Sequence, residues 1–182
     1  LRPSGQTGTC QVGCNCMAAI AIREAPREPL SIMLRVPGWA ADASVAVNGQ
    51  ATNLEARPGA YLAVRRRWST GDLMEMSLPM DVVFLQANPL VEEARNQVAV
   101  MRGPIVYCLE SIDLPDGVNI ENVAINPRGQ WTAEPRPDLL GGITVLNGDA
   151  IVSARQDWTG RLYRRMDLGD SKRIRVKLIP YY

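Results

Sequence analysis

Three cysteines near the start of the chain have the spacing that most suggests a chemical site. Cys10, Cys14 and Cys16 lie close together, and thiolates at such short spacing can share one zinc ion. A structural zinc site takes four ligands, however, and the chain contains no histidine to supply the fourth. The spacing also differs from the paired two-residue gaps of zinc knuckles and ribbons. We therefore expect free thiols and predict no metal site in this chain.

The absence of histidine also limits catalysis, because it excludes Ser-His-Asp and Cys-His machinery within the chain. The remaining acid–base candidates are the adjacent Glu92 and Glu93 and the single residues Asp113 and Asp116. Glycosidases hold two carboxyl groups about 5–5.5 Å apart when they retain configuration and about 6.5–9.5 Å apart when they invert it. Adjacent strand residues point to opposite faces, so Glu92 and Glu93 are poorly placed to share a substrate. We predict no catalytic residue here.

Tryptophans are the candidate binding residues. Flat aromatic rings suit stacking against sugars, since each offers apolar area and a polar edge. The same residues more often fill a core or an interface between domains. An exposed coplanar pair would favour sugar binding, and burial of all of them would favour a structural role. The candidate carbohydrate-binding residues are Trp39, Trp68, Trp131 and Trp158.

Charge and hydropathy limit the partners. The net charge is +1, and strand alternation divides the run Arg65-Arg66-Arg67 between two faces, so we expect no nucleic-acid partner. No apolar run approaches the ~20 residues that a membrane helix needs, so we expect no membrane partner either. Free thiols favour a cytosolic setting, without fixing the compartment.

The hydrophobic pattern predicts an all-β protein built as an antiparallel β-sandwich. Apolar and polar residues alternate along residues 30–36, 60–68 and 73–80, with turns between them. The pairs Asn48-Gly49 and Asn147-Gly148 predict tight hairpin turns. Residues 98–110 read as two apolar strands that are joined where Gly103 and Pro104 interrupt the pairing.

Turn residues at Asn88 and Pro89 predict a boundary between two small sandwiches. We expect an irregular segment over residues 1–17, a partial first sandwich over 18–88 and a second sandwich over 89–182, in which residues 111–140 are mostly loop. The first sandwich is expected to be incomplete and to expose an apolar edge or face around Leu30, Ile32 and Leu34. Such an edge favours self-association, including a homodimer.

A series of short motifs follows in order along the chain. They are LRVPGWA (34–40), VNG (47–49), WSTGD (68–72), LPM (78–80), VAVMRGPIVYCLE (98–110) and IPYY (179–182). In this order they resemble the C-terminal region of glycoside hydrolase family 127, the β-L-arabinofuranosidase family.

The resemblance implies a parent protein that hydrolyses O-glycosyl bonds with an N-terminal (α/α)6 barrel, a zinc-bound cysteine nucleophile and a glutamate acid/base. All of these precede the matched motifs, so none is carried over to this chain, and zinc is implied for the parent's catalytic domain alone. The chain is then a non-catalytic sandwich portion whose partner is that barrel. The alternatives are a carbohydrate-binding module that uses the tryptophans, and a structural or dimerising sandwich.

Overall fold

The structure is a computed structural model, and it describes the chain except for residues 1–6, 11–14, 154–158, 164, 166–168 and 182. Within this part every strand pair is antiparallel, and the helices are three short 3-10 turns. None of the described helices is long and apolar enough to cross a membrane. The predicted all-β antiparallel class is confirmed.

The chain divides into two compact units, Leu1–Asp81 and Val82–Tyr182. The sequence placed the boundary at residues 88 and 89, where the turn signals are strongest. The structure places it earlier because Val82–Leu85 forms strand β8, which pairs with β9 (Ala99–Arg102). The turn at Asn88 therefore lies inside the second unit, in the loop between these two strands.

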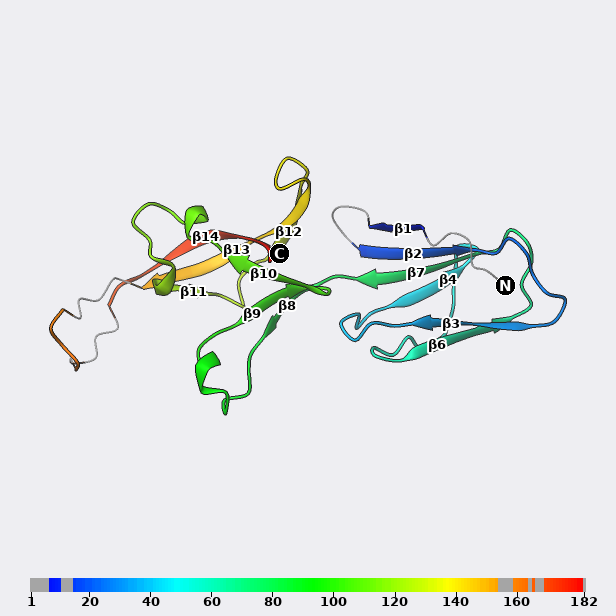
Figure 1. The fold of residues 1–182 in the computed structure, drawn as a ribbon, viewed down its shortest axis with the longest axis horizontal. Helices are drawn as coiled ribbons and strands as arrows, with labels where there is room; N and C mark the ends of the chain where they lie inside the picture. The colour runs from blue at the N-terminus through cyan, green and yellow to red at the C-terminus, as the bar shows by residue number, and fades with distance from the viewer. Residues whose placement is uncertain (1–6, 11–14, 154–158, 164, 166–168, 182) are drawn as a thin grey trace. The chain divides into compact units, whose positions relative to one another are not determined.

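The first unit is a sandwich of two antiparallel sheets (Figure 1). The larger sheet has the order β1-β2-β7-β4-β5, and the smaller one pairs β3 with β6. Its strands are β1 (Thr7–Cys10), β2 (Asn15–Ala21), β3 (Leu30–Arg35), β4 (Ser44–Val47), β5 (Gln50–Ala51), β6 (Tyr61–Arg66) and β7 (Leu73–Pro79).

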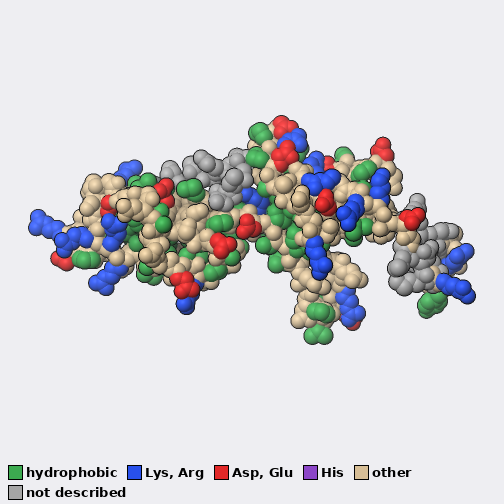
Figure 2. All heavy atoms as spheres, turned by 180° about the vertical axis from the view of Figure 1, so that it is seen from behind, with side chains coloured by type: hydrophobic (Ala, Val, Ile, Leu, Met, Phe, Trp, Pro, Cys, Tyr) green, Lys and Arg blue, Asp and Glu red, His purple; other side chains and the backbone are tan. Residues whose placement is uncertain are grey.

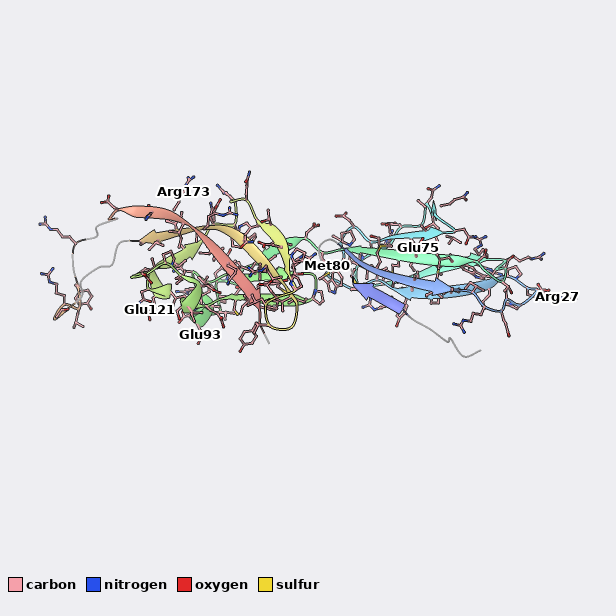
Figure 3. The ribbon with its side chains drawn as sticks, turned by 90° about the horizontal axis from the view of Figure 1, so that it is seen from above. Arg27, Glu75, Met80, Glu93, Glu121 and Arg173 are labelled. Carbon is pink, nitrogen blue, oxygen red and sulfur yellow. The ribbon has the colours of Figure 1, made fainter. Side chains whose placement is uncertain are left out.

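One core joins the two sheets of this unit. Along β7, Met74, Met76 and Leu78 are buried, while Glu75 between them is partly exposed and is labelled in Figure 3. This is the alternation that the sequence predicted. The buried residues of the core are Leu34, Val36, Ala40, Val45, Val47, Leu62, Val64, Trp68, Met74, Met76 and Leu78.

Strand β3 is buried only toward its C-terminal end. Leu34 is 9% exposed, Ile32 is partly buried, and Leu30 is 37% exposed. The outward-facing Met33 is 54% exposed, and Tyr61, which is paired with Arg35 on the same strand pair, is 65% exposed. The first unit thus exposes part of the apolar set that the sequence singled out.

Residues 1–17 were expected to be irregular, and this expectation requires a correction. Thr7–Cys10 forms β1, which pairs with residues 16–19 of β2, and β2 begins at Asn15. The segment has no apolar period, so nothing in its side chains predicts a strand. Its backbone groups pair with a β2 strand whose other edge is already held by β7.

The second unit is one sheet of seven strands with the order β11-β13-β14-β10-β9-β8, and β12 also pairs with β13. The additional strands are β10 (Ile105–Leu109), β11 (Val123–Ile125), β12 (Thr132–Arg136), β13 (Ile143–Ser153) and β14 (Ser171–Pro180). Strands β11 and β12 lie in a region that was expected to be mostly loop. They pair with successive parts of β13, at residues 150–152 and 143–147.

The ends of this sheet approach each other across its concave face. Phe84 lies on β8 at one end, and Trp131 precedes β12 at the other end. Their ring centroids are 5.4 Å apart in an edge-to-face arrangement. Both rings pack on a core formed by Val100, Tyr107, Leu146 and Leu178, so the sheet is curved around this core.

The predicted strand pair at residues 98–110 is confirmed. Strands β9 and β10 pair around Gly103-Pro104, and Gly103 adopts a φ of 58°. Tyr107 is buried in the core just described, while Cys108 points to the other face and packs against Ile143, Val145 and Ile179. This hairpin therefore contributes to the packing on both faces of the sheet.

The turn predicted at Asn147-Gly148 is wrong. Both residues lie inside the long strand β13, where Gly148 is paired with Val176. A Cβ atom at Gly148 would lie 2.2 Å from Cδ2 of Trp131. The indole ring lies directly on the strand at Gly148, so this glycine marks a close approach of another group to the sheet, not a turn.

Candidate functional site

A hydrogen-bonded cluster in the first unit joins two of the motifs found in the sequence. Asn48 follows β4, and Asp72 precedes β7. The Asn48 side chain donates to Oδ1 of Asp72 at 2.8 Å and accepts from the backbone N–H of Leu73 at 2.8 Å. Oδ2 of Asp72 accepts from the backbone N–H of Ser69 at 2.9 Å. We call Asn48, Ser69, Asp72 and Leu73 the turn clasp.

Electrostatics keep the clasp carboxylate ionised. Asp72 is 9% exposed. The hydrogen bond from Asn48 and then the Ser69 N–H lower its pKa below the ordinary value of 3.8, while desolvation opposes them and Arg66 adds a further lowering. A carboxylate whose pKa is lowered by backbone and amide donors is a poor general acid at neutral pH. The clasp therefore stabilises the turns and does not suit proton transfer.

The tryptophans mostly serve packing. Trp68 is 3% exposed, donates from Nε1 to the carbonyl of Leu30 at 3.0 Å, and carries the Arg66 guanidinium 5.2 Å from its ring. Trp131 is partly buried against Phe84 and donates to the carbonyl of Asn126 at 2.9 Å. Trp39 is partly buried against the first core. Trp158 lies outside the described residues. The packing of Trp68 and Trp131 leaves neither ring as an open sugar platform.

The structure brings together no metal-binding group of cysteines in the part of the chain that it describes. The β1–β2 register places Cys10 opposite Cys16, and Cys14 lies outside the described residues. Cys108, in the second unit, is a free thiol. Burial, and then the nearby Glu110, raise the pKa of the Cys108 thiol, which makes it a weak nucleophile. No group of three or more potential ligands is found among the residues that the structure describes.

Two of the four acidic candidates, Glu92 and Asp113, take part in ion pairs. Glu92 begins the first 3-10 turn (η1, Glu92–Ala94) and lies 3.3 Å from Arg95. Asp113 ends the second turn (η2, Ser111–Asp113) and lies 2.7 Å from Nζ of Lys177 on β14. These pairs tie loops to their neighbours and show no acid–base arrangement. On the face shown in Figure 2, acidic and basic side chains are interspersed and form no continuous basic surface.

A cleft that the sequence did not reveal lies within the second unit. It has a volume of about 880 Å³, within the range of about 300–1,000 Å³ that is usual for small-molecule sites. Its walls are β8 with the following loop on one side, and on the other side β11 with the third 3-10 turn (η3, Ile120–Asn122). The lining residues are Phe84, Gln86, Asn96, Gln97, Val98, Glu121, Asn122, Val123, Ala124, Ile125, Pro127 and Ser153.

The two walls of this cleft come from sheet ends that are distant in the chain. Among the described strands, β8 pairs with β9 alone and β11 pairs with β13 alone, so each has one edge that no described strand covers. Sequence patterns show which residues share a strand, but they do not show that the free edges of two end strands meet. The polar side chains at residues 86, 96, 97 and 122 looked like ordinary loop residues for this reason.

The comparisons with known proteins cover both units. Residues 11–80 match the model described as the middle domain of GH127 β-L-arabinofuranosidases, and residues 82–182 match the glycoside hydrolase family 127 C-terminal domain. The chain belongs to glycoside hydrolase family 127. The resemblance read from the motifs is thus confirmed, and the two family domains meet where the two structural units divide.

Named relatives are longer than this family 127 chain. It is 34% identical over 157 residues to the non-reducing end β-L-arabinofuranosidase of Bifidobacterium longum subsp. longum, and the aligned region covers 82% of this chain and 23% of the relative. A solved glycoside hydrolase is 34% identical with a TM-score of 0.82, over 96% of this chain and 29% of its own. The GH127 β-L-arabinofuranosidase of Geobacillus stearothermophilus T6 is 31% identical with a TM-score of 0.80, over 97% and 27%. The chain spans less than a third of each.

Proposed function

We propose that this chain is the non-catalytic sandwich portion of a glycosidase resembling β-L-arabinofuranosidases, and that it supports an (α/α)6 catalytic barrel. One observation carries the proposal: the family motifs of the first unit form the turn clasp and its surroundings. Asn48 belongs to VNG, and Ser69 and Asp72 belong to WSTGD. Asn and Asp side chains that bond to one another and to nearby backbone stabilise turns, and this structural role suits a supporting domain.

The site chemistry supports the same role. Asp72, the buried carboxylate, is held ionised by hydrogen bonds, and the Cys108 thiol has a raised pKa. The zinc chemistry of the family is assigned in this proposal to the barrel. Exposed apolar residues such as Met33 and Tyr61 on β3 and β6 offer a surface for a neighbouring domain. The alternative of a sugar platform formed by the tryptophans has no such supporting observation.

A complementation experiment tests the supporting role. The catalytic barrel of the Geobacillus stearothermophilus relative is produced without its middle and C-terminal domains, and its thermal midpoint and hydrolytic rate are measured with and without this chain. We expect the added chain to raise both, because covering apolar barrel surface stabilises the folded state by mass action. A barrel that is equally stable and active without the chain contradicts the proposal. Bovine serum albumin serves as the control for nonspecific protection.

A further inference from the structure

The cleft of the second unit is lined by neutral hydrogen-bonding groups. Gln86 and Asn96 come from one wall and Asn122 from the other. A carboxamide offers an acceptor oxygen and two N–H donors. Within the described part of the chain, the side chains of these three residues make no hydrogen bond to protein groups. Their hydrogen-bonding capacity is therefore available to a ligand.

The charge of the lining narrows the ligand class. Glu121 is the one charged residue among those that line the cleft, and no lysine or arginine is among them. A carboxylate accepts hydrogen bonds from hydroxyl groups and repels anions. Phosphorylated and other anionic ligands are thereby disfavoured, and neutral polyhydroxylated ligands are favoured. Phe84, whose ring also contacts Trp131 and the core, adds an apolar part to the lining.

Internal hydrogen bonds hold both walls in place before any ligand arrives. On one side, Oδ1 of Asn119 accepts from the N–H of Glu121 at 3.0 Å, which fixes the turn that carries Glu121 and Asn122. On the other side, Nε2 of Gln97 donates to the carbonyl of Glu93 at 3.2 Å, and the Gln97 N–H bonds to the carbonyl of Ala94. In Figure 3, Glu93 and Glu121 lie at the same end of this unit.

We propose that this cleft is a carbohydrate-binding subsite for neutral sugars, formed between the free edges of β8 and β11 and separate from the tryptophans. Carboxamides bind hydroxyl groups well, because a hydroxyl both donates and accepts a hydrogen bond and a carboxamide can do the same. The open cleft leaves part of a sugar in solvent, so we expect a Kd of roughly 1 mM for a single monosaccharide unit. The subsite would hold a substrate chain near the enzyme and would not take part in bond cleavage.

Binding is tested on the 182-residue chain with methyl β-L-arabinofuranoside as the probe, by saturation-transfer NMR. The choice of this sugar rests on the proposed function; the cleft itself does not. We expect Gln86→Ala and Asn122→Ala each to weaken binding by about 2–10-fold, the effect of losing one hydrogen bond. Gln130→Ala is the matched control, since Gln130 is an exposed amide of the same unit outside the cleft, and it should leave binding unchanged.

Charge gives a second, independent measurement. Methyl β-D-glucuronide carries a carboxylate on the same ring as neutral methyl β-D-glucoside, so the wild-type chain should bind it more weakly than the glucoside, and Glu121→Gln should reduce that difference. Circular dichroism verifies that each variant is folded. Absence of binding to the folded chain overturns the proposal. Binding that survives Gln86→Ala and Asn122→Ala unchanged also overturns it, because the sugar then lies elsewhere. Neither result affects the barrel complementation, so the two proposals fail separately.

Discussion

Gly148 and Trp131 show how one residue without a side chain permits an aromatic ring to lie on a strand. The indole covers Gly148 so closely that a Cβ atom there would lie 2.2–2.4 Å from three ring carbons. The ring also holds its place through the hydrogen bond to Asn126 and the contact with Phe84. The strand and the ring must therefore separate if any side chain is introduced.

We expect Gly148→Ala to lower the free energy of unfolding by about 1–3 kcal/mol, the usual result of forcing extra atoms into a packed core. Urea denaturation measures the change. Gly38→Ala is the matched control, because a Cβ at Gly38 meets no atom within 4 Å, and it should be nearly neutral. Equal stabilities for the two variants would contradict the packing of Trp131 on the strand.

Asp72 gives the first unit a pH dependence with a definite sign. Its pKa in the folded chain is below the ordinary 3.8, chiefly because Asn48 donates to it. The folded state thus favours the ionised form, and this contribution to stability is fully present above the unfolded pKa of about 3.9. It is lost as the pH falls through the lower folded value.

The test compares Asp72→Asn with the wild type by thermal unfolding at several pH values. The variant should be less stable near neutral pH, and the gap should narrow as the pH falls below about 4. Curves that stay parallel throughout would show that the Asp72 carboxylate makes no net electrostatic contribution to the clasp.

At the scale of elements, the hairpin between β4 and β5 depends on backbone that few residues adopt. Asn48 has a φ of 53° and Gly49 a φ of 75°, the left-handed values of a two-residue hairpin turn. We expect Gly49→Val to destabilise the chain by roughly 1 kcal/mol or more, because a β-branched residue resists positive φ. Gly49→Asn should cost less, since asparagine tolerates this region. Chemical denaturation ranks the two, and the reverse order would argue against the turn.

The same dipeptide illustrates what the sequence could and could not reveal. Asn48-Gly49 turns the chain, and its asparagine is bonded to Asp72 and Leu73. Asn147-Gly148 continues a strand, and its glycine accommodates Trp131. Local turn propensity is equal at the two positions. The contact with Trp131, which precedes β12, decides the second case, and no local pattern shows that contact.

Other elements show the same difference between local patterns, which the sequence reveals, and contacts between distant residues, which it does not. The alternation of Met74, Met76 and Leu78 predicted their burial on β7, because side-chain period is a local property. Strand β1 was not predicted, because it is held by backbone pairing with β2 and its side chains show no apolar period. The cleft could not be anticipated, since it requires the free edges of β8 and β11 to approach each other.

At the scale of the whole molecule, each unit has cores of its own. The core of the first unit draws only on residues up to 78, and those of the second only on residues from 82 onward. We therefore expect residues 82–182 to fold when produced alone, as units with their own cores generally do. A ¹H–¹⁵N correlation spectrum should be dispersed and should overlay on that of the longer chain. A collapsed spectrum would show that the second unit depends on the first.

Under the proposed supporting role, this family 127 chain does not hydrolyse glycosides by itself. The most direct measurement is hydrolysis of 4-nitrophenyl β-L-arabinofuranoside by the purified chain, with a heat-denatured sample as the control. We expect no release of nitrophenol above that control, because the chain has no histidine and its acidic candidates Glu92 and Asp113 take part in ion pairs. Turnover that scales with the concentration of the folded chain, and that is lost on denaturation, would contradict it.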